Sequence, residues 1–170
     1  MKKFVVLVFY LIIMVWHSAS AQNEKFKALF MYNFTKYIEW PANSRQGDFI
    51  IGVVGNPSLA VELQTIASKQ KVGVQNIVVR NFNSVDEIDY CHIIYLGHSK
   101  SNLFGSLLSK VNGKNTLIIT DKEGLALQGA GINYIMDGDR LKYEVNRTNI
   151  ERKGLVVSNS LLALGVAVSN

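Results

Sequence analysis

The chain has 170 residues, of which 48% are hydrophobic and 18% are charged, and its formal net charge is +5 at pH 7. The 18 basic residues are scattered along the chain, which excludes the basic clusters of a nucleic-acid-binding domain. Its one cysteine, Cys91, excludes an internal disulfide, and its apolar neighbours favour a buried, inert thiol over a free thiol that pairs with another molecule.

The first 21 residues have the pattern of a secretory signal peptide. Lys2 and Lys3 form a charged n-region, residues 4–16 are an apolar h-region, and Ala19-Ser20-Ala21 is an A-x-A cleavage site. A membrane span needs about 20 apolar residues, so this run is too short to be one, and an uncleaved anchor is the weaker alternative. We therefore expect cleavage after Ala21 and an exported mature chain, residues 22–170, that does not itself span the membrane.

Aromatic and aliphatic side chains recur at steps of three and four from Phe26 to Ile38, which predicts a helix with one broad aromatic face. Polar residues such as Lys27 occupy the opposite side of this helix. Because proline disfavours helical geometry in the residue before it, Trp40-Pro41 should end the helix near Glu39. Aromatic side chains at helical spacing are most often core residues, and stacking against a ligand is the alternative.

Strands and helices alternate between residues 49 and 120. Continuous apolar runs predict strands at residues 49–54, 77–82, 91–96 and 116–120. Helices are expected at residues 59–67 and 103–111, with one helical turn at 84–87. Asn56 and Pro57 supply the cap and the first-turn proline of the first of these helices, and Gly113 closes the last.

The pattern changes beyond residue 120. Residues 132–136 and 141–145 are apolar runs that flank Asp137-Gly138-Asp139-Arg140, a turn sequence that joins two strands directly and predicts an antiparallel hairpin within residues 131–146. Three shorter elements complete the expected order, namely a polar helix at 148–153, an apolar run at 155–157 that fits a further strand, and a helix at 161–168 capped by Ser158 or Asn159.

This order of elements predicts a single three-layer α/β domain, with a mostly parallel sheet, helices on both faces and an antiparallel edge formed by the hairpin. Sheets of this class bind ligands in a crevice at the carboxyl ends of their strands. Polar residues at those ends form the candidate small-molecule site, and they are Asn56, His98, Ser99 and Asp121. A small-molecule-binding module is therefore one functional hypothesis.

Catalysis is a weaker hypothesis. Gly97-His98-Ser99-Lys100-Ser101 resembles a nucleophile elbow, but serine stands where the elbow needs its second glycine, so a hydrolase that combines Ser99 with His92 or His98 and Asp121 is unfavoured. Cys91 and His92 are adjacent on a strand and point to opposite faces, so they cannot share a metal ion. No dinucleotide or Walker pattern occurs. We expect no metal, no cofactor and no enzymatic activity, and we interpret residues 91–96 as a buried core strand.

Several segments are distinctive when they are taken in order. They are Phe30-Met31-Tyr32-Asn33-Phe34 leading into Glu39-Trp40-Pro41, Val54-Gly55, Cys91-His92-Ile93-Ile94-Tyr95, Leu117-Ile118-Ile119-Thr120-Asp121, Gly129-Ala130-Gly131-Ile132-Asn133, Tyr143-Glu144-Val145-Asn146, and Gly154-Leu155-Val156-Val157-Ser158 before Leu161-Leu162. Together they resemble the YfiR family of exported bacterial proteins over essentially the whole mature chain.

The resemblance implies a non-enzymatic periplasmic regulator that binds the periplasmic sensor domain of an inner-membrane diguanylate cyclase and holds it inactive, which limits cyclic di-GMP and biofilm formation. It also implies that the protein acts as a dimer, whereas regulation through an internal disulfide cannot apply to a chain with one cysteine. Because Tyr and Trp are frequent interface anchors, Tyr32, Tyr37 and Trp40 are the candidate partner-binding residues. For Tyr37, core packing is the favoured role and partner binding is the alternative.

Overall fold

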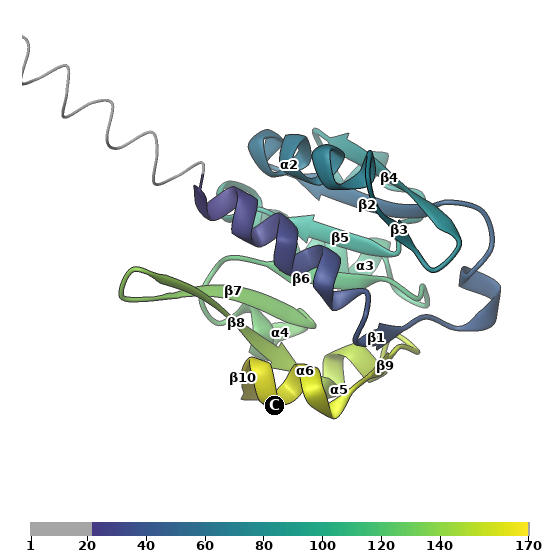
Figure 1. The fold of residues 1–170 in the computed structure, drawn as a ribbon. Helices are drawn as coiled ribbons and strands as arrows, with labels where there is room; N and C mark the ends of the chain where they lie inside the picture. Colours follow the sequence, from purple (N-terminus) through teal and green to yellow (C-terminus); the bar gives the residue numbers. More distant parts are fainter. Residues whose placement is uncertain (1–21, 170) are drawn as a thin grey trace, which may run out of the picture.

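An eight-stranded, mostly parallel sheet forms the centre of the computed structural model, which describes residues 22–169 (Figure 1). Its strands in spatial order are β10 (Val166–Val168), β8 (Arg140–Asn146), β7 (Ile132–Asp137), β6 (Leu117–Thr120), β5 (Ile93–Leu96), β2 (Phe49–Val54), β4 (Gln75–Phe82) and β3 (Lys71–Val72). The five neighbours from β7 to β4 all run parallel to one another. The predicted signal peptide lies outside the described residues.

Helices cover both faces of the sheet, as the sequence predicts. The N-terminal helix (residues 22–34) and α2 (Pro57–Ala67) pack on one face, and α3 (Phe104–Lys110) and α4 (Leu125–Gln128) pack on the other. Strand β5 is buried on both sides, because Ile93 and Tyr95 join the first layer while Ile94 and Leu96 join the second. The remaining short helices are η1 (Ala42–Ser44), η2 (Val85–Glu87), η3 (His98–Leu103), α5 (Arg147–Glu151) and α6 (Asn159–Leu164).

The order of the parallel strands reverses between β2 and β5. From β2 the chain passes through α2 to β4 on one side, and then returns to β5 on the other side of β2. In open parallel sheets this reversal point, at the carboxyl ends of the strands, is where ligands commonly bind. The loops that follow β2 and β5 therefore meet at the edge where the sequence places its candidate ligand residues.

The predicted hairpin is confirmed, but it does not form the edge of the sheet. Strands β7 and β8 pair antiparallel from Ile132 opposite Val145 to Asp137 opposite Arg140, and Gly138 takes a positive φ of 59° in the turn. Strand β10 then pairs with β8 in parallel on its outer side. The final helix ends at Leu164 rather than near Val168, because the next residues extend to form this strand.

A glycine makes that change from helix to strand feasible. Gly165 has an extended backbone and lies against the ring of Tyr143, so that a Cβ at this position would stand 2.6 Å from a ring carbon. Val166 and Val168, which follow it, are β-branched and favour the extended form. The apolar spacing that predicts a helix to residue 168 therefore gives way to pairing with β8.

The N-terminal helix is also shorter than predicted. It ends at residue 34, three turn residues follow, and Ile38–Glu39 forms β1, which pairs antiparallel with β9 (Val156–Val157) in a separate two-stranded sheet. The backbone N–H of Ser158 also donates to the carbonyl of Tyr37 at 2.9 Å. The aromatic spacing continues past the helix because Ile38 and Trp40 still point into the core.

Candidate functional site

The N-terminal helix crosses the sheet close to β5 and β6 (Figure 1). A network of polar side chains joins the helix to the carboxyl ends of these two strands. Lys27 Nζ on the helix lies 3.0 Å from Asp121 Oδ2 and 3.1 Å from Glu24 Oε1. Tyr95 on β5 donates its hydroxyl proton to the same Asp121 oxygen at 2.5 Å. Asp121, which directly follows β6, therefore joins the helix to two neighbouring strands.

This network is largely removed from water. The Lys27 and Asp121 side chains are 11% and 14% exposed, and such buried charges are tolerated only when they are paired. Burial, and secondly the negative charge of Asp121, raises the pKa of Tyr95 well above its usual value. The phenol therefore stays protonated and acts as a hydrogen-bond donor, which fits its contact with Asp121.

The sequence prediction placed Lys27 on the solvent side of the helix, and this is wrong. Lys27, Met31 and Phe34 form the buried stripe, at spacings of four and three residues, whereas Phe26 and Leu29 are 42% and 46% exposed. The prediction used only hydrophobic residues to choose the buried face, and this placed that face too far around the helix axis. The spacing of Lys27 from Met31 and Phe34 is the signal that identifies it, because long side chains bury their stems along apolar surfaces.

Asn56 is confirmed as the cap of α2, and its side chain is fully used. Its Oδ1 accepts from the backbone N–H of Leu59 at 3.0 Å, and its Nδ2 donates to Glu24 Oε2 at 2.8 Å. Asn56 thus joins α2 to the network around Lys27. No local pattern indicates that this cap also holds the N-terminal helix, because the contact spans 32 residues.

Ser99 is exposed, and its hydroxyl donates to the Gly55 carbonyl at 3.2 Å. The loops after β2 and β5 are packed so closely that a Cβ on Gly97 would stand 2.9 Å from the Gly55 oxygen. The loops after β2 and β5 therefore contact each other directly beside Ser99. His92 is hydrogen-bonded to Ser44 and Ile50, and Asp121 to Lys27 and Tyr95. Within residues 22–169, neither side chain forms a hydrogen bond to Ser99.

An open cavity lies further along the same edge, between the N-terminal helix and the β7–β8 hairpin, with a volume of about 570 Å³. His98 and Asp121 line it, whereas Asn56 and Ser99 lie outside its lining. Its walls carry more acids than bases, since Lys27 faces four carboxylates, those of Glu24, Asp121, Glu123 and Glu144. Met136 and Leu141 from the hairpin form an apolar side.

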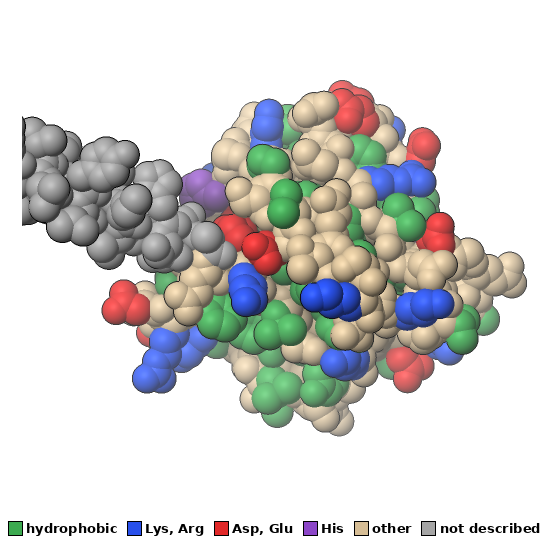
Figure 2. All heavy atoms as spheres, turned by 45° about the horizontal axis from the view of Figure 1, so that its top comes forward, with side chains coloured by type: hydrophobic (Ala, Val, Ile, Leu, Met, Phe, Trp, Pro, Cys, Tyr) green, Lys and Arg blue, Asp and Glu red, His purple; other side chains and the backbone are tan. Residues whose placement is uncertain are grey.

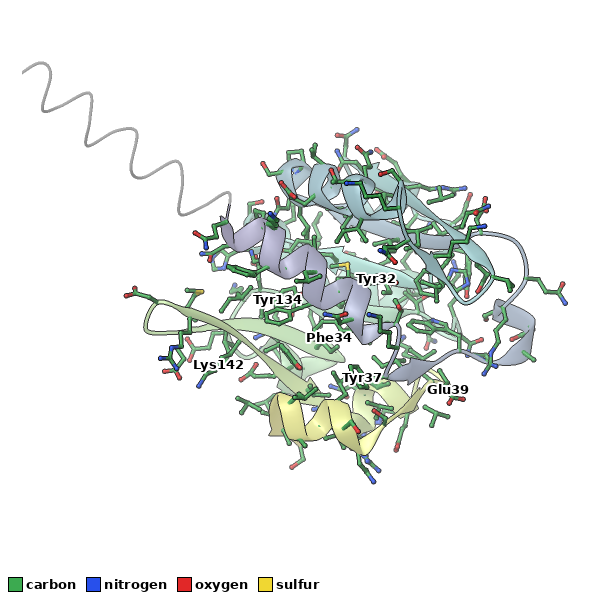
Figure 3. The ribbon with its side chains drawn as sticks, in the orientation of Figure 1. Tyr32, Phe34, Tyr37, Glu39, Tyr134 and Lys142 are labelled. Carbon is green, nitrogen blue, oxygen red and sulfur yellow. The ribbon has the colours of Figure 1, made fainter. Side chains whose placement is uncertain are left out.

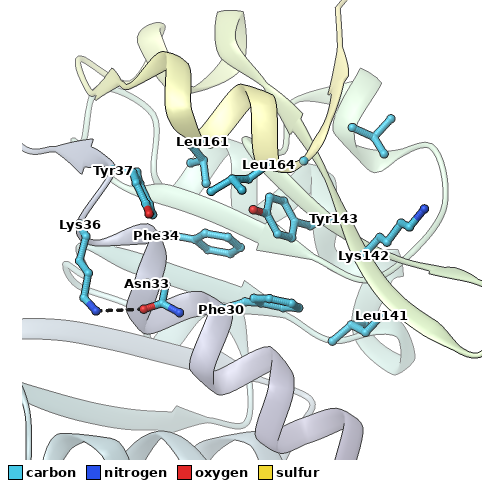
Figure 4. Close-up of a pocket in the computed structure, with 12 residues that line it drawn as sticks. Phe30, Asn33, Phe34, Lys36, Tyr37, Leu141, Lys142, Tyr143, Leu161 and Leu164 are labelled. Carbon is cyan, nitrogen blue, oxygen red and sulfur yellow. Dashed lines mark hydrogen bonds between the residues drawn. The ribbon is translucent and has the colours of Figure 1, made fainter.

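An aromatic groove of about 490 Å³ lies between the N-terminal helix, β8 and α6 (Figure 4). Its floor is formed by the rings of Phe30, Phe34 and Tyr143. The ring of Tyr143 packs edge to face against both phenylalanines, with centroid distances of 4.8 Å to Phe34 and 5.4 Å to Phe30. Leu164 and Val166 form the far wall and remain 64% and 43% exposed. Exposed apolar side chains beside a hollow are typical of a binding surface.

The three candidate partner-binding residues lie in different places, and Figure 3 labels two of them, Tyr32 and Tyr37. Tyr37 lines the aromatic groove, and Tyr32 is half-buried on the N-terminal helix, where its hydroxyl donates to Gln70 Oε1 at 2.9 Å. Trp40 is only 5% exposed, and its Nε1–H donates to the His92 carbonyl at 3.3 Å. Trp40 is therefore mainly a core residue in this structure.

Cys91 and His92 point to opposite sides of the sheet, as the sequence predicts. Cys91 packs in the layer that contains α3, and burial raises the pKa of its thiol to about 11, which keeps it protonated and unreactive. His92 Nδ1 accepts from the N–H of Ile50, so Nε2 carries the proton and donates to the Ser44 carbonyl at 2.7 Å.

In residues 22–169, no group of three or more His, Cys, Asp and Glu side chains is placed to hold a metal ion.

The sequence model of the YfiR/HmsC-like family matches residues 24–166. A solved structure, titled a conserved domain protein from Vibrio cholerae O1 biovar eltor strain N16961, aligns with a TM-score of 0.51 and 15% sequence identity, over 72% of this chain and 55% of that chain. The chain thus spans about half the length of that protein, and the likeness shows the fold alone. No curated protein matches the sequence. Across the described residues, no helix has both the length and the apolar character to cross a membrane.

Proposed function

The chain belongs to the YfiR/HmsC-like family, and from this membership we propose that it is a non-enzymatic regulator that binds the sensor domain of a membrane-bound diguanylate cyclase and holds it inactive. Proteins of this family are in general periplasmic regulators of diguanylate cyclases. The proposal includes export with cleavage after Ala21 and action in the periplasm. Loss of the protein would then raise cyclic di-GMP and promote biofilm formation.

The observation that carries the proposal beyond the family is the aromatic groove. It offers exposed apolar side chains, Leu164 and Val166, next to the half-buried Tyr37. Lys36 and Lys142 stand at its rim, and no Asp or Glu is among the described residues that line it. On the face drawn in Figure 2, hydrophobic side chains gather near a row of Lys and Arg side chains. Such a surface suits a protein partner that presents apolar side chains flanked by acids.

Repression by binding has a defined energetic requirement. The regulator must bind the inactive state of the cyclase more tightly than the active state, and each tenfold preference shifts the equilibrium by about 1.4 kcal/mol. To move a cyclase from mostly active to mostly inactive, the regulator must bind the inactive state several tens to thousands of times more tightly than the active state. Such a ratio of affinities requires a set of well-packed contacts. A groove with aromatic floor residues is able to supply such contacts because aromatic side chains dominate interface energetics.

The proposal is tested by deleting the gene in a host that has a periplasm-facing cyclase and measuring cyclic di-GMP and surface attachment. Both should rise, and the unchanged chain should restore them to the original level. Complementation with Leu164→Asp should fail, because a charge enters the groove wall. Leu127→Asp, at a similarly exposed leucine (53%) on α4, is the matched control and should restore repression. Unchanged cyclic di-GMP after deletion contradicts the proposal.

A further inference from the structure

We propose that the outer edge of β4 binds an extended, acidic segment of a partner protein as an additional strand. This surface is distinct from the aromatic groove, because β4 lies near one end of the eight-stranded sheet and β8, which lines the groove, lies near the other (Figure 1). Exposed sheet edges bind extended peptides through backbone hydrogen bonds. The inference therefore goes beyond the regulatory function and concerns a second interaction surface.

The backbone of β4 is paired on one side only over most of its length. Strand β2 pairs with residues 77–82 along the inner side of β4. On the outer side, β3 pairs only with Gln75 and Asn76, because β3 is two residues long. Within residues 22–169, no strand pairs with the outer side of residues 77–82. This segment therefore presents free backbone N–H and C=O groups, which are the groups that accept another strand.

One face of the sheet beside this edge is incompletely covered. Arg80 pairs with Gly52, and a Cβ on Gly52 would meet Cys91, which packs in the layer that contains α3. Arg80 is therefore on the α3 side of the sheet. Val78 and Phe82 are on the same side, because alternate residues of a strand share a face, and both remain partly exposed. An added strand with apolar side chains beside them would remove this surface from water.

Basic side chains along the edge select the charge of the partner. Arg80 lies within the free segment, and Lys69 and Lys71 lie at the end where β3 stops. All three are exposed, and none forms an ion pair among the described residues. The nearest acids along the chain after Arg80 are Asp86 and Glu87, which lie beyond the end of β4. Because opposite charges on neighbouring strands attract, a strand that places an acid opposite Arg80 is favoured.

The same charges disfavour a second copy of this chain as the occupant. An antiparallel pair of β4 strands related by a twofold axis would bring two Arg80 side chains close together, because Arg80 lies near the middle of residues 77–82. Like charges on facing strands are destabilising, and residues 77–82 contain no acid to offset them. A partner segment with an acid between apolar residues avoids this repulsion.

The test uses three synthetic peptides with capped ends on the purified protein. The first, Thr-Val-Thr-Glu-Thr-Val-Thr, places a glutamate between two valines on one face of a strand. The second has lysine in place of the glutamate, and the third is the glutamate peptide methylated at every backbone nitrogen. In ¹H–¹⁵N NMR titrations the glutamate peptide should bind saturably, with a Kd below about 1 mM and the largest shifts at residues 77–82. The lysine peptide should bind about 5-fold more weakly, and the methylated peptide, which lacks backbone donors, should not bind.

Charge reversal locates the site. Arg80→Glu changes an exposed residue, so folding is preserved, and it should reverse the preference, so that the lysine peptide binds more tightly than the glutamate peptide. Arg152→Glu, at an exposed arginine that caps the end of α5, is the matched control and should keep the original preference. Because no cyclase is present, the outcome is independent of the regulatory function proposed above.

Three results would overturn the proposal. They are no saturable binding of the glutamate peptide, equal binding of the methylated peptide, and an unchanged preference in Arg80→Glu. Hydrogen exchange of the protein alone gives a further check, because the outer amides of residues 77–82 should exchange freely at every protein concentration. Protection of these amides that rises with protein concentration would assign the edge to a second copy of the chain instead.

Discussion

Replacing Lys27 with methionine is the sharpest test of how the N-terminal helix is held to the sheet. At 3.0 Å from Asp121 and with an effective dielectric constant of about 20, the attraction between the two charges is about 5.5 kcal/mol before the cost of desolvation. Lys27→Met removes this attraction and leaves Glu24 and Asp121 close together without a cation. Removing one partner of a buried pair typically costs about 3 to 5 kcal/mol, and we expect a loss of this size.

The loss is measured by urea unfolding of the purified protein at pH 7.5. A domain of this size has a stability of about 5 to 15 kcal/mol, so the variant should remain folded but unfold at a clearly lower urea concentration. Lys25→Met, at the exposed neighbour, is the control and should change stability by no more than about 0.5 kcal/mol. Adding Asp121→Asn to Lys27→Met should recover part of the loss, because one uncompensated charge disappears. If Lys27→Met is as stable as Lys25→Met, the network does not hold the helix.

Three further predictions concern the core. Burial lowers the pKa of His92, although its hydrogen bond to a backbone carbonyl opposes the shift. The unfolded chain therefore binds a proton more readily than the folded protein, and the free energy of unfolding should fall as the pH drops below about 6.5. Urea titrations at several pH values should show that His92→Asn reduces this pH dependence. Gly165→Ala places a methyl group against Tyr143 and should cost about 1 to 3 kcal/mol in the same assay, whereas Gly105→Ala, with nothing within 4 Å, should be neutral or stabilising. Native Cys91, with its pKa raised to about 11, should resist a thiol reagent at pH 8 until urea unfolds the chain, and rapid labelling of the folded protein would contradict its burial.

Much of the fold was predictable because its signals are local. The strand at residues 49–54 is a continuous apolar run, and the structure reproduces its limits as Phe49–Val54. Asn56 and Pro57 start the next helix as expected, since capping needs only residues within one turn. The turn around Gly138 fixes the hairpin for the same reason. These features depend on neighbours in the sequence, and the residues themselves reveal them.

The missed features depend on contacts between distant parts of the chain. Strands β1 and β10 are short, and neither pairs with a neighbour in the sequence. The partner of β1 is β9, far along the chain, and the partner of β10 is β8, which precedes the last helices. Apolar spacing alone therefore favoured helices at Ile38 and at Val166. In the candidate site, Asp121 and His98 were predictable as residues at strand ends. Lys27, the partner of Asp121, was missed because their contact spans 94 residues and a lysine on a helix is normally solvent-exposed. Only its helical spacing from Met31 and Phe34 marks it as part of the buried stripe.

Direct binding tests the central claim most simply. The purified periplasmic sensor domain of the host's diguanylate cyclase is titrated with this protein in a calorimeter, alongside the Leu164→Asp and Leu127→Asp variants. We predict saturable binding by the unchanged chain and by Leu127→Asp, and binding at least 10-fold weaker for Leu164→Asp, because a charge in the groove wall loses a buried apolar contact. No binding by the unchanged chain, or equal binding by all three proteins, would contradict the proposed regulatory groove.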